Sequence, residues 1–398
     1  MGPATIFLVM GFILSLGTTL LSANRARSDA HHTLYSAYET RVARDCARSG
    51  AQMAIREVLV NSSWREGFDQ KALGGGHFDV TVEDAGTNGE LGINDILITA
   101  QGTYADQVQE VRASLVRRAY SHYAYFTDYE PQIWFITGDT IRGPVHTNGQ
   151  FHIYDRPVFT GHVTSVADDY ATYRGIHDPD FQDGAEFGVA AIDLPTDLEH
   201  LESTAQNGGR MFYEDTWLTF ESDGTVEYQT RSGTSGTIDL DHINGAIYVS
   251  GDHDLFVQGT LNGQVTMGSE GKIRIQGDLV YNEDPRIVPE SDDYAGLVAL
   301  DDIVVQDTPA NRNNCHIHAS MMAIDGSFQV HRYNRGAPRG TLHILGGVIQ
   351  KRRGPVGTFG GSGSTGYIKN YAYDERLLST APPAFPIMER PVLVAWAD

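Results

Sequence analysis

The sequence has little cysteine and little positive charge. Its 398 residues include two cysteines, Cys46 and Cys315, and no CxxC pair or Cys/His cluster with the spacing of a zinc site. Two cysteines so far apart do not form a disulfide framework, so we expect two free thiols. The formal net charge is -22. This charge argues against nucleic-acid binding, which needs basic surface.

Charge of either sign is missing from the N-terminal segment, where the first charged residue is Arg25. A stretch of about 20 apolar residues is long enough to span a bilayer as a helix. We expect its large apolar side chains to act through helix–helix packing, because each buried CH₂ contributes about 0.8 kcal/mol. These side chains are Ile6, Phe7, Leu8, Val9, Phe12, Ile13, Leu14, Leu16, Leu20 and Leu21.

Three interpretations fit this apolar segment. A secretory signal peptide would begin with basic residues, and nothing basic precedes the apolar run. A plain membrane anchor would use Arg25 and Arg27 to mark the cytoplasmic side, which would leave the large body inside the cell. In the third interpretation, the segment is a helix that packs against helices of other subunits. Apolar and small residues recur at helical spacing as far as Leu59, and small residues let helices approach closely.

The segment GPATIFLVMGFILSLGTTLL, followed by ARSGAQMAIREV, resembles the N-terminal region of type IV pilins, and most of all the minor pilus-assembly pilins. The resemblance implies a helix that packs in a filament core, with Met1 as the processed and methylated N-terminus. The chain departs from major pilins at Thr5, where they usually carry Glu. Without that carboxylate, Thr5 cannot form the usual salt link to a neighbouring N-terminal amine. The sequence therefore leaves open whether the chain is a major or a minor subunit.

The remainder of the chain predicts an α+β fold. Residues 77–84, 95–104 and 108–118 alternate at period two and predict a small antiparallel sheet packed on the helix. Later, short strands end at Gly, Asn or Asp with no long amphipathic helix between them, which excludes a βαβ fold. A sandwich or barrel would give similar spacing, but the short repeats favour a parallel β-solenoid, or β-helix.

We therefore expect three regions. Residues 1–65 form the hydrophobic helix and stalk, and residues 66–120 form the small sheet. Residues 121–398 form the solenoid-like body, with an insertion at about 165–240 and an extended C-terminal tail. The aromatic-rich residues 120–129 are expected at the junction of sheet and solenoid, with a sugar-binding or partner-binding surface as the alternative.

Candidate metal ligands are few. His316 and His318 share one face of a predicted strand, and with His331 or His343 they could bind a metal, but a polar surface stripe gives the same pattern. Paired aspartates such as Asp301–Asp302 leave calcium as an alternative, although none has EF-hand spacing. We expect no metal and no cofactor.

Candidate catalytic residues are equally scattered. The residues Asp252, Asp254, Arg274 and Asp278 could line a polysaccharide-cleaving groove, but such residues decorate any solenoid face. There is no GxSxG, P-loop or triad signature, so we expect no enzyme.

The sequence thus predicts a structural subunit of an extracellular type IV pilus-like filament at the cell surface. Its partners would be copies of itself or other pilins, and the inner membrane before assembly. The body would be exposed for adhesion to a surface glycan, a host or another cell. The alternative is a membrane-anchored β-helix protein that binds or cleaves polysaccharide.

Overall fold

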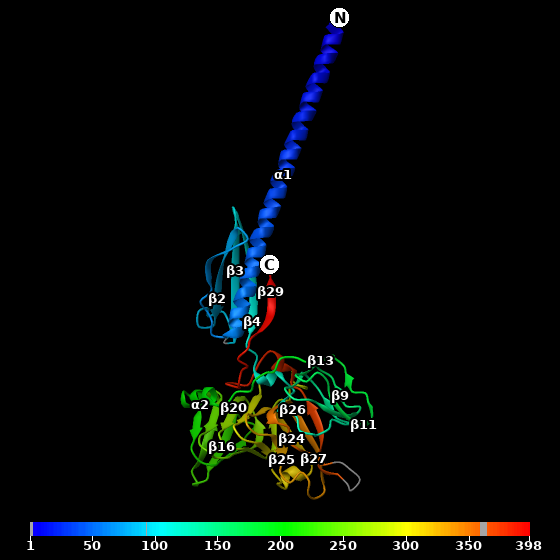
Figure 1. Cartoon of the computed structure of the whole chain (residues 1–398). Coiled ribbons are helices and arrows are strands. Elements are labelled where there is room, and N and C mark those ends of the chain that lie inside the picture. Colours follow the sequence, from blue (N-terminus) through cyan, green and yellow to red (C-terminus); the bar gives the residue numbers. More distant parts are fainter. Residues whose placement is uncertain (1–2, 93, 359–363) are drawn as a thin grey trace. The chain divides into compact units, whose positions relative to one another are not determined.

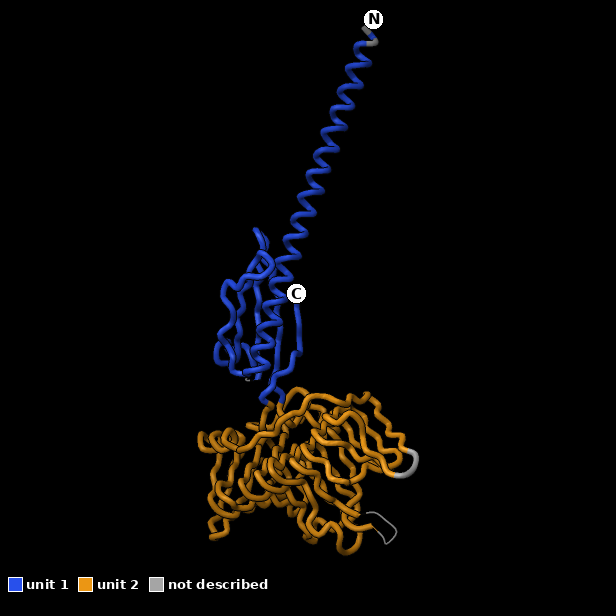
Figure 2. Tube along the Cα trace, in the orientation of Figure 1, with its two compact units in different colours: residues 1–118, 389–398 blue, residues 119–388 orange. Residues whose placement is uncertain are grey.

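The computed structural model describes residues 3–92, 94–358 and 364–398. The chain divides into two compact units (Figure 2). The first contains the residues up to Arg118 together with Glu389–Asp398, and the second contains Ala119–Met388.

The first unit combines one long helix with a five-stranded sheet (Figure 1). Helix α1 runs from Pro3 to Val60, and its C-terminal half packs on the sheet. All four strand pairings in this sheet are antiparallel. In spatial order the strands are β1 (Phe68–Leu73), β2 (Gly76–Asp84), β3 (Asp95–Tyr104), β4 (Gln107–Val116) and β29 (Val392–Ala397).

Small side chains hold the helix close to the sheet. Ala43, Ala47, Ala51 and Ala54 are fully buried against apolar residues of β2, β3 and β4. Gly102 of β3 lies under the helix, where an added Cβ would be 2.1 Å from the carbonyl oxygen of Ala43 and 2.4 Å from the backbone nitrogen of Ala47. The predicted small antiparallel sheet is confirmed, and its side-chain alternation follows the predicted period of two.

The C-terminal residues lie in a different place from the one predicted. They were expected as an extended tail of the body, but β29 pairs with β4 and becomes the edge strand of the first sheet. Asp398 pairs with Arg48 of α1 and accepts a 2.7 Å hydrogen bond from the indole Nε1 of Trp396. A local pattern cannot reveal this pairing, because all of the second unit separates the two strands in the sequence.

The second unit consists of parallel ladders around an apolar interior. In the first ladder the spatial order is β14 (Arg210–Phe212), β18 (Ala246–Val249), β20 (Gln264–Ser269), β22 (Tyr294–Ala299), β24 (Cys315–Ala323), β26 (Pro338–Arg352), β5 (Tyr125–Tyr129), β7 (Val145–Thr147), β10 (Val163–Ser165) and β13 (Ala185–Phe187). The second ladder contains β15 (Thr216–Phe220), β19 (Leu255–Leu261), β21 (Ile273–Tyr281), β23 (Ile303–Val305) and β25 (Phe328–Val330).

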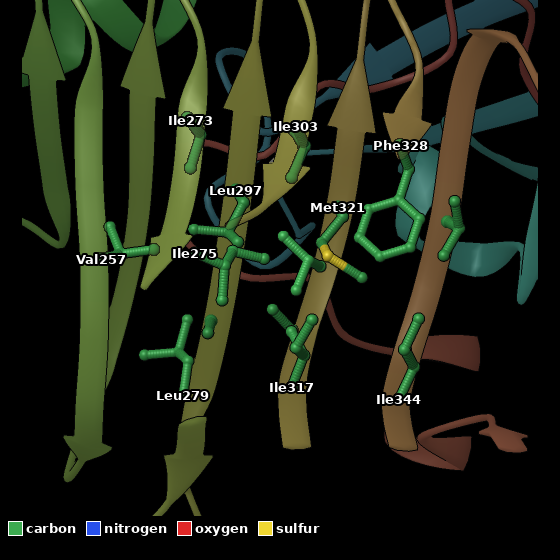
Figure 3. Close-up of a cluster of buried hydrophobic side chains, with 14 of the residues drawn as sticks. Val257, Ile273, Ile275, Leu279, Leu297, Ile303, Ile317, Met321, Phe328 and Ile344 are labelled. Carbon is green, nitrogen blue, oxygen red and sulfur yellow. The ribbon is translucent and has the colours of Figure 1, made fainter. Parts of the chain in front are cut away.

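A third ladder continues from the first halves of β24 and β26. Its further strands are β28 (Thr365–Ala372), β6 (Thr140–Ile141), β9 (Val158–Phe159) and β12 (Asp180–Phe181). The parallel pair β8 (His152–Asp155) and β11 (Ala171–His177) lies outside these ladders. Side chains such as Val257, Ile275 and Leu297 lie together in the interior (Figure 3).

Antiparallel pairs interrupt this parallel pattern. β16 (Thr225–Thr230) and β17 (Ser235–Asp239) extend β15 as a hairpin, and β27 (Gly357–Thr358) pairs with β28. The sheets of the body are therefore mixed. The α+β class, with a long N-terminal helix, a small antiparallel sheet and a large β-rich domain, is confirmed.

The predicted insertion at about 165–240 is corrected by the strand pairings. This range contributes β12, β13, β14 and β15 to the ladders, whereas β11 pairs with β8 outside them and β16 and β17 form a lateral hairpin. The segment that follows β13 carries α2 (Glu199–Gln206), whose buried residues Leu201 and Ala205 pack with Tyr248. The sequence suggested an insertion because these strands are short and irregularly spaced.

The strand order in space differs from the order in the chain. β5 pairs with the end of β26, so the first strands of the body stack on strands from near its C-terminus. Buried charges cross this junction. The side chains of Arg353 and Glu130 are 4% and 0% exposed and form a 3.3 Å salt bridge, while the hydroxyl of Tyr125 donates to Glu130 at 2.6 Å. The guanidinium of Arg353 also lies 3.8 Å from the ring centroid of Phe135.

Gly102→Ala should loosen the docking of α1 on its sheet. The added methyl group has no room against the helix backbone, and such overpacking costs about 1–3 kcal/mol. Cys46 belongs to the same helix and is buried on its docked side, so maleimide labelling of this thiol, located by peptide mapping, should become faster. Gly89→Ala is the control, since no atom lies within 4 Å of its added Cβ. Equal labelling rates in the two variants would contradict the close packing described above.

Glu130→Gln should destabilise the second unit by about 3–5 kcal/mol, because it leaves the buried Arg353 without its carboxylate. Urea unfolding followed by tryptophan fluorescence measures this loss. The double variant Glu130→Leu/Arg353→Met should recover much of it. Asp178→Asn removes an exposed partner of Arg156 and should change little. If the Glu130→Gln variant were as stable as the wild type, the Glu130–Arg353 pair would not stabilise the contact between β5 and β26.

Candidate assembly site on the N-terminal helix

The N-terminal half of α1 exposes every one of the ten apolar side chains selected from the sequence. Their exposed fractions run from 52% at Val9 and Leu16 to 75% at Phe7 and Leu8. Met10, which was not selected, is 59% exposed and belongs to the same surface. At about 100° per residue these positions surround the helix completely. Helices that are apolar all round are buried in a membrane or among other helices.

The backbone and hydroxyl groups of this segment are compatible with such burial. The hydroxyls of Thr18 and Thr19 donate to the carbonyl of Ser15 at 2.9 and 2.8 Å, and that of Ser22 donates to the carbonyl of Thr19 at 2.9 Å. These polar groups are thus satisfied inside the helix, so no water is needed. By length and composition, α1 qualifies as a helix that could cross a membrane.

Two glycines of this half have no neighbour within the chain that requires so small a residue. An added Cβ at Gly11 or Gly17 would meet no atom within 4 Å. Each glycine nevertheless costs about 1 kcal/mol relative to Ala in a helix. Close approach of a second helix is a physical reason for small residues at these positions.

The structure adds a second exposed apolar group, which the sequence analysis missed. Leu34, Tyr35 and Tyr38 are 67%, 67% and 58% exposed on the part of α1 between the apolar half and the docked half. Tyr38 contacts Tyr104 edge to face, with 6.1 Å between ring centroids. Large side chains one and four positions apart in a polar stretch were the available signal.

The predicted processed N-terminus, Met1, lies outside the described residues, and so does the side chain of Thr5. Processing, methylation and the consequence of Thr5 therefore stay predictions. The packing role of the ten apolar residues also stays a prediction, since exposure shows that they are available and not what covers them.

The histidines selected as metal ligands have other partners. His316 stacks on His343 with ring centroids 4.4 Å apart, and Asn370 contacts His343 Nδ1 at 3.0 Å. His318 is buried, and its Nδ1 accepts a 3.1 Å hydrogen bond from the backbone N–H of Tyr281. His331 lies in the turn after β25. Among the described residues, no group of three or more His, Cys, Asp and Glu is placed to hold a metal ion.

The selected acidic and thiol groups are also engaged. Asp254 pairs with Arg274, and Asp278 accepts a 2.8 Å hydrogen bond from the backbone N–H of His316. Cys46 and Cys315 are free and buried, as the sequence predicted for two thiols without a disulfide. Burial raises the pKa of Cys315 to about 12. This thiol is therefore a poor nucleophile at neutral pH.

Comparison with known proteins gives a family match and similarities to solved structures. Residues 77–167 match the family described as a domain of unknown function (DUF4900). No curated protein matches. A competence-associated pilin, ComZ from Thermus thermophilus, is similar over 90% of this chain and 97% of its own, with 10% identity and a TM-score of 0.40.

His318 should make the second unit sensitive to acid. Burial lowers the pKa of His318 to about 4, and the nearby Asp284 opposes this shift. The unfolded chain therefore binds the proton first, and the free energy of unfolding should fall by up to about 3 kcal/mol from about pH 6.5 to pH 4. Urea unfolding at each pH measures the slope. His318→Asn keeps an acceptor for the backbone N–H of Tyr281 and should make the free energy of unfolding depend less on pH. An unchanged pH dependence in this variant would assign the acid sensitivity to other groups.

Proposed function

We propose that this chain is a structural subunit of a type IV pilus-like filament. The single observation that supports this function best is the apolar N-terminal half of α1, which is exposed on all sides and continuous with a half that is docked on a folded sheet. In a filament, neighbouring copies or other pilins would cover this surface, and before assembly the membrane would cover it.

The continuity of α1 favours assembly over simple anchoring. A plain anchor needs apolar length alone, whereas Gly11 and Gly17 reduce helix stability for no gain within one chain. Glycines at those positions are useful when another helix approaches closely. The large side chains between them would then pack against that helix.

The charge of the chain supports contact through the helix rather than through the body. A net charge of -22 makes two bodies repel each other and keeps them soluble. The apolar half of α1 contains no charged residue before Arg25, so it can associate without this repulsion. Helix association would thus place the acidic bodies on the outside, exposed to the medium at the cell surface.

We interpret the body as a parallel β-solenoid. Successive strands return beside their predecessors in three parallel ladders, and their inward residues share one apolar interior. Such stacking gives long outer faces on which residues from several strands stand in rows. An exposed body of this kind would serve adhesion. We propose no enzymatic activity for it.

Leu14→Asp should abolish filament assembly while the two folded units persist. Leu14 is 66% exposed in the middle of the apolar half, and an Asp there costs about 2.5–3.5 kcal/mol in a membrane-inserted helix. Electron microscopy of sheared cell-surface material, with antibody labelling of this chain, would show whether filaments contain it.

Ser28→Asp is the matched control, because Ser28 is an exposed position of the same helix beyond the apolar half. This variant should assemble like the wild type. Circular dichroism and protease resistance of both variants in detergent should be unchanged. Normal filaments from the Leu14→Asp variant would overturn the proposed function.

A further inference from the structure

A groove lies on the outer side of the second ladder. Its volume is about 360 Å³, and its floor contains Arg274 of β21, Val304 of β23 and Gln329 of β25. These three residues are neighbours in register across the parallel strands. The turn after β25, residues 331–335, forms one side of the groove.

The groove concentrates positive charge in an acidic chain. Lys272, Arg274, Arg332 and Arg335 all line it. Lys272 pairs with Asp301 at 3.0 Å and with Asp302 at 2.5 Å, and Arg274 pairs with Asp254. Four cations minus these three carboxylates leave about one positive charge, opposite in sign to the chain's -22.

Two of these cations remain available for a ligand. Arg332 and Arg335 are exposed, and neither forms a salt bridge within the described part of the chain. The carboxylate of Asp307 pairs with Arg312 and Arg339, and its pKa is lowered mainly by the hydrogen bond from Arg312, with a smaller effect of the charge of Arg332. Lysine and arginine side chains without a carboxylate partner, when held beside a groove, can donate charge-assisted hydrogen bonds to an anion. The groove therefore offers two free donors beside two that are already paired.

The turn that carries Arg332 and Arg335 is fixed to the body. The buried Arg339 donates from Nη2 to the carbonyl of Arg332 at 3.3 Å, and Thr365 donates to the carbonyl of Tyr333 at 2.7 Å. Arg332 has φ of 53°, a left-handed conformation that non-glycine residues rarely adopt. Gly or Asn would adopt it at lower cost. The charge of the Arg332 side chain gives a reason for an arginine at this position.

Aromatic residues extend the same outer row beyond the groove. Trp217 of β15 and Phe256 of β19 stack with ring centroids 4.4 Å apart, and the guanidinium of Arg274 lies 5.9 Å from the centroid of Phe256. The row thus runs over five strands from Trp217 to Gln329. At about 4.8 Å between strands it is about 19 Å long.

We propose that this row and groove bind an acidic polysaccharide, a glycan whose sugars carry carboxylates. Arg332 and Arg335 would bind carboxylates, while Asp254 and Asp302 would accept hydrogen bonds from sugar hydroxyls. A nucleic acid presents about one phosphate charge per 1.7 Å of duplex and would face three carboxylates and an acidic chain. The mixture of donors, acceptors and apolar surface therefore matches an acidic glycan better than a polyphosphate.

The test uses the full chain in detergent micelles, with polygalacturonate as the acidic probe and dextran as the neutral one. Isothermal titration calorimetry should show binding to polygalacturonate that weakens with added NaCl, and no binding to dextran. Arg332→Ala/Arg335→Ala should weaken binding by about a hundredfold or more, because each of the two lost charge-assisted hydrogen bonds contributes about a factor of ten.

Arg156→Ala/Arg231→Ala is the matched control. Both arginines are exposed on the same unit, at 64% and 73% of their side chains, and neither lines the groove. This variant should bind like the wild type, and Arg332→Lys/Arg335→Lys should retain most of the binding.

Three results would overturn the glycan proposal. They are unchanged affinity in the Arg332→Ala/Arg335→Ala variant, equal affinity for dextran, and tighter binding of single-stranded DNA than of polygalacturonate. Filament assembly is measured separately and should be normal in this variant, so failure of the glycan proposal leaves the proposed function untouched.

Discussion

The apolar N-terminal half of α1, called the free half below, must be covered by a membrane or by other helices, and this requirement constrains the rest of the chain. A helix with large apolar side chains on every side is not stable in water as a free surface. The sequence therefore needs either a membrane or other helices around residues 6–21 at every stage. In the proposed assembly the body must not aggregate while the helix moves from the membrane into the filament, and the net charge of -22 opposes aggregation by repulsion.

One helix thus follows two packing rules along its length. Residues of the free half are large and distributed all round, which suits an environment that is apolar on every side. The docked half has small residues on one side only, from Ala43 to Ala54, and these let the backbone come within contact distance of Gly102. The change from one rule to the other occurs in the polar stretch that carries Leu34, Tyr35 and Tyr38.

Both rules could be predicted from the sequence because they are local periodicities. The helix and the strands β2, β3 and β4 follow from spacing, and the ten apolar residues selected from the sequence all lie exposed on α1. The edge strand β29 could not be found, since its partner β4 is far from it in the sequence, with the whole second unit between them. The same reason hid the pairing of β5 with β26 and the salt bridge of Glu130 with Arg353, which are 223 residues apart.

Parallel ladders also explain why the groove could not be recognised from the sequence. A ladder brings residues from successive strands into one row, although each of them is unremarkable in its own segment. From the sequence, Arg274 was grouped with Asp252, Asp254 and Asp278 as candidates for one polysaccharide-cleaving groove. In the structure Asp254 is the partner of Arg274, whereas Asp278 contacts His316 in a different row.

The register decides which residues share a row, and the register is set by the buried side of each strand. Ile273, Ile303 and Phe328 point inward and align with one another, so Arg274, Val304 and Gln329 must align on the outside. Slipping one strand by a single residue would turn its inward residues to solvent and disperse the outer row at the same time. The packing of the interior therefore fixes the composition of the proposed binding surface.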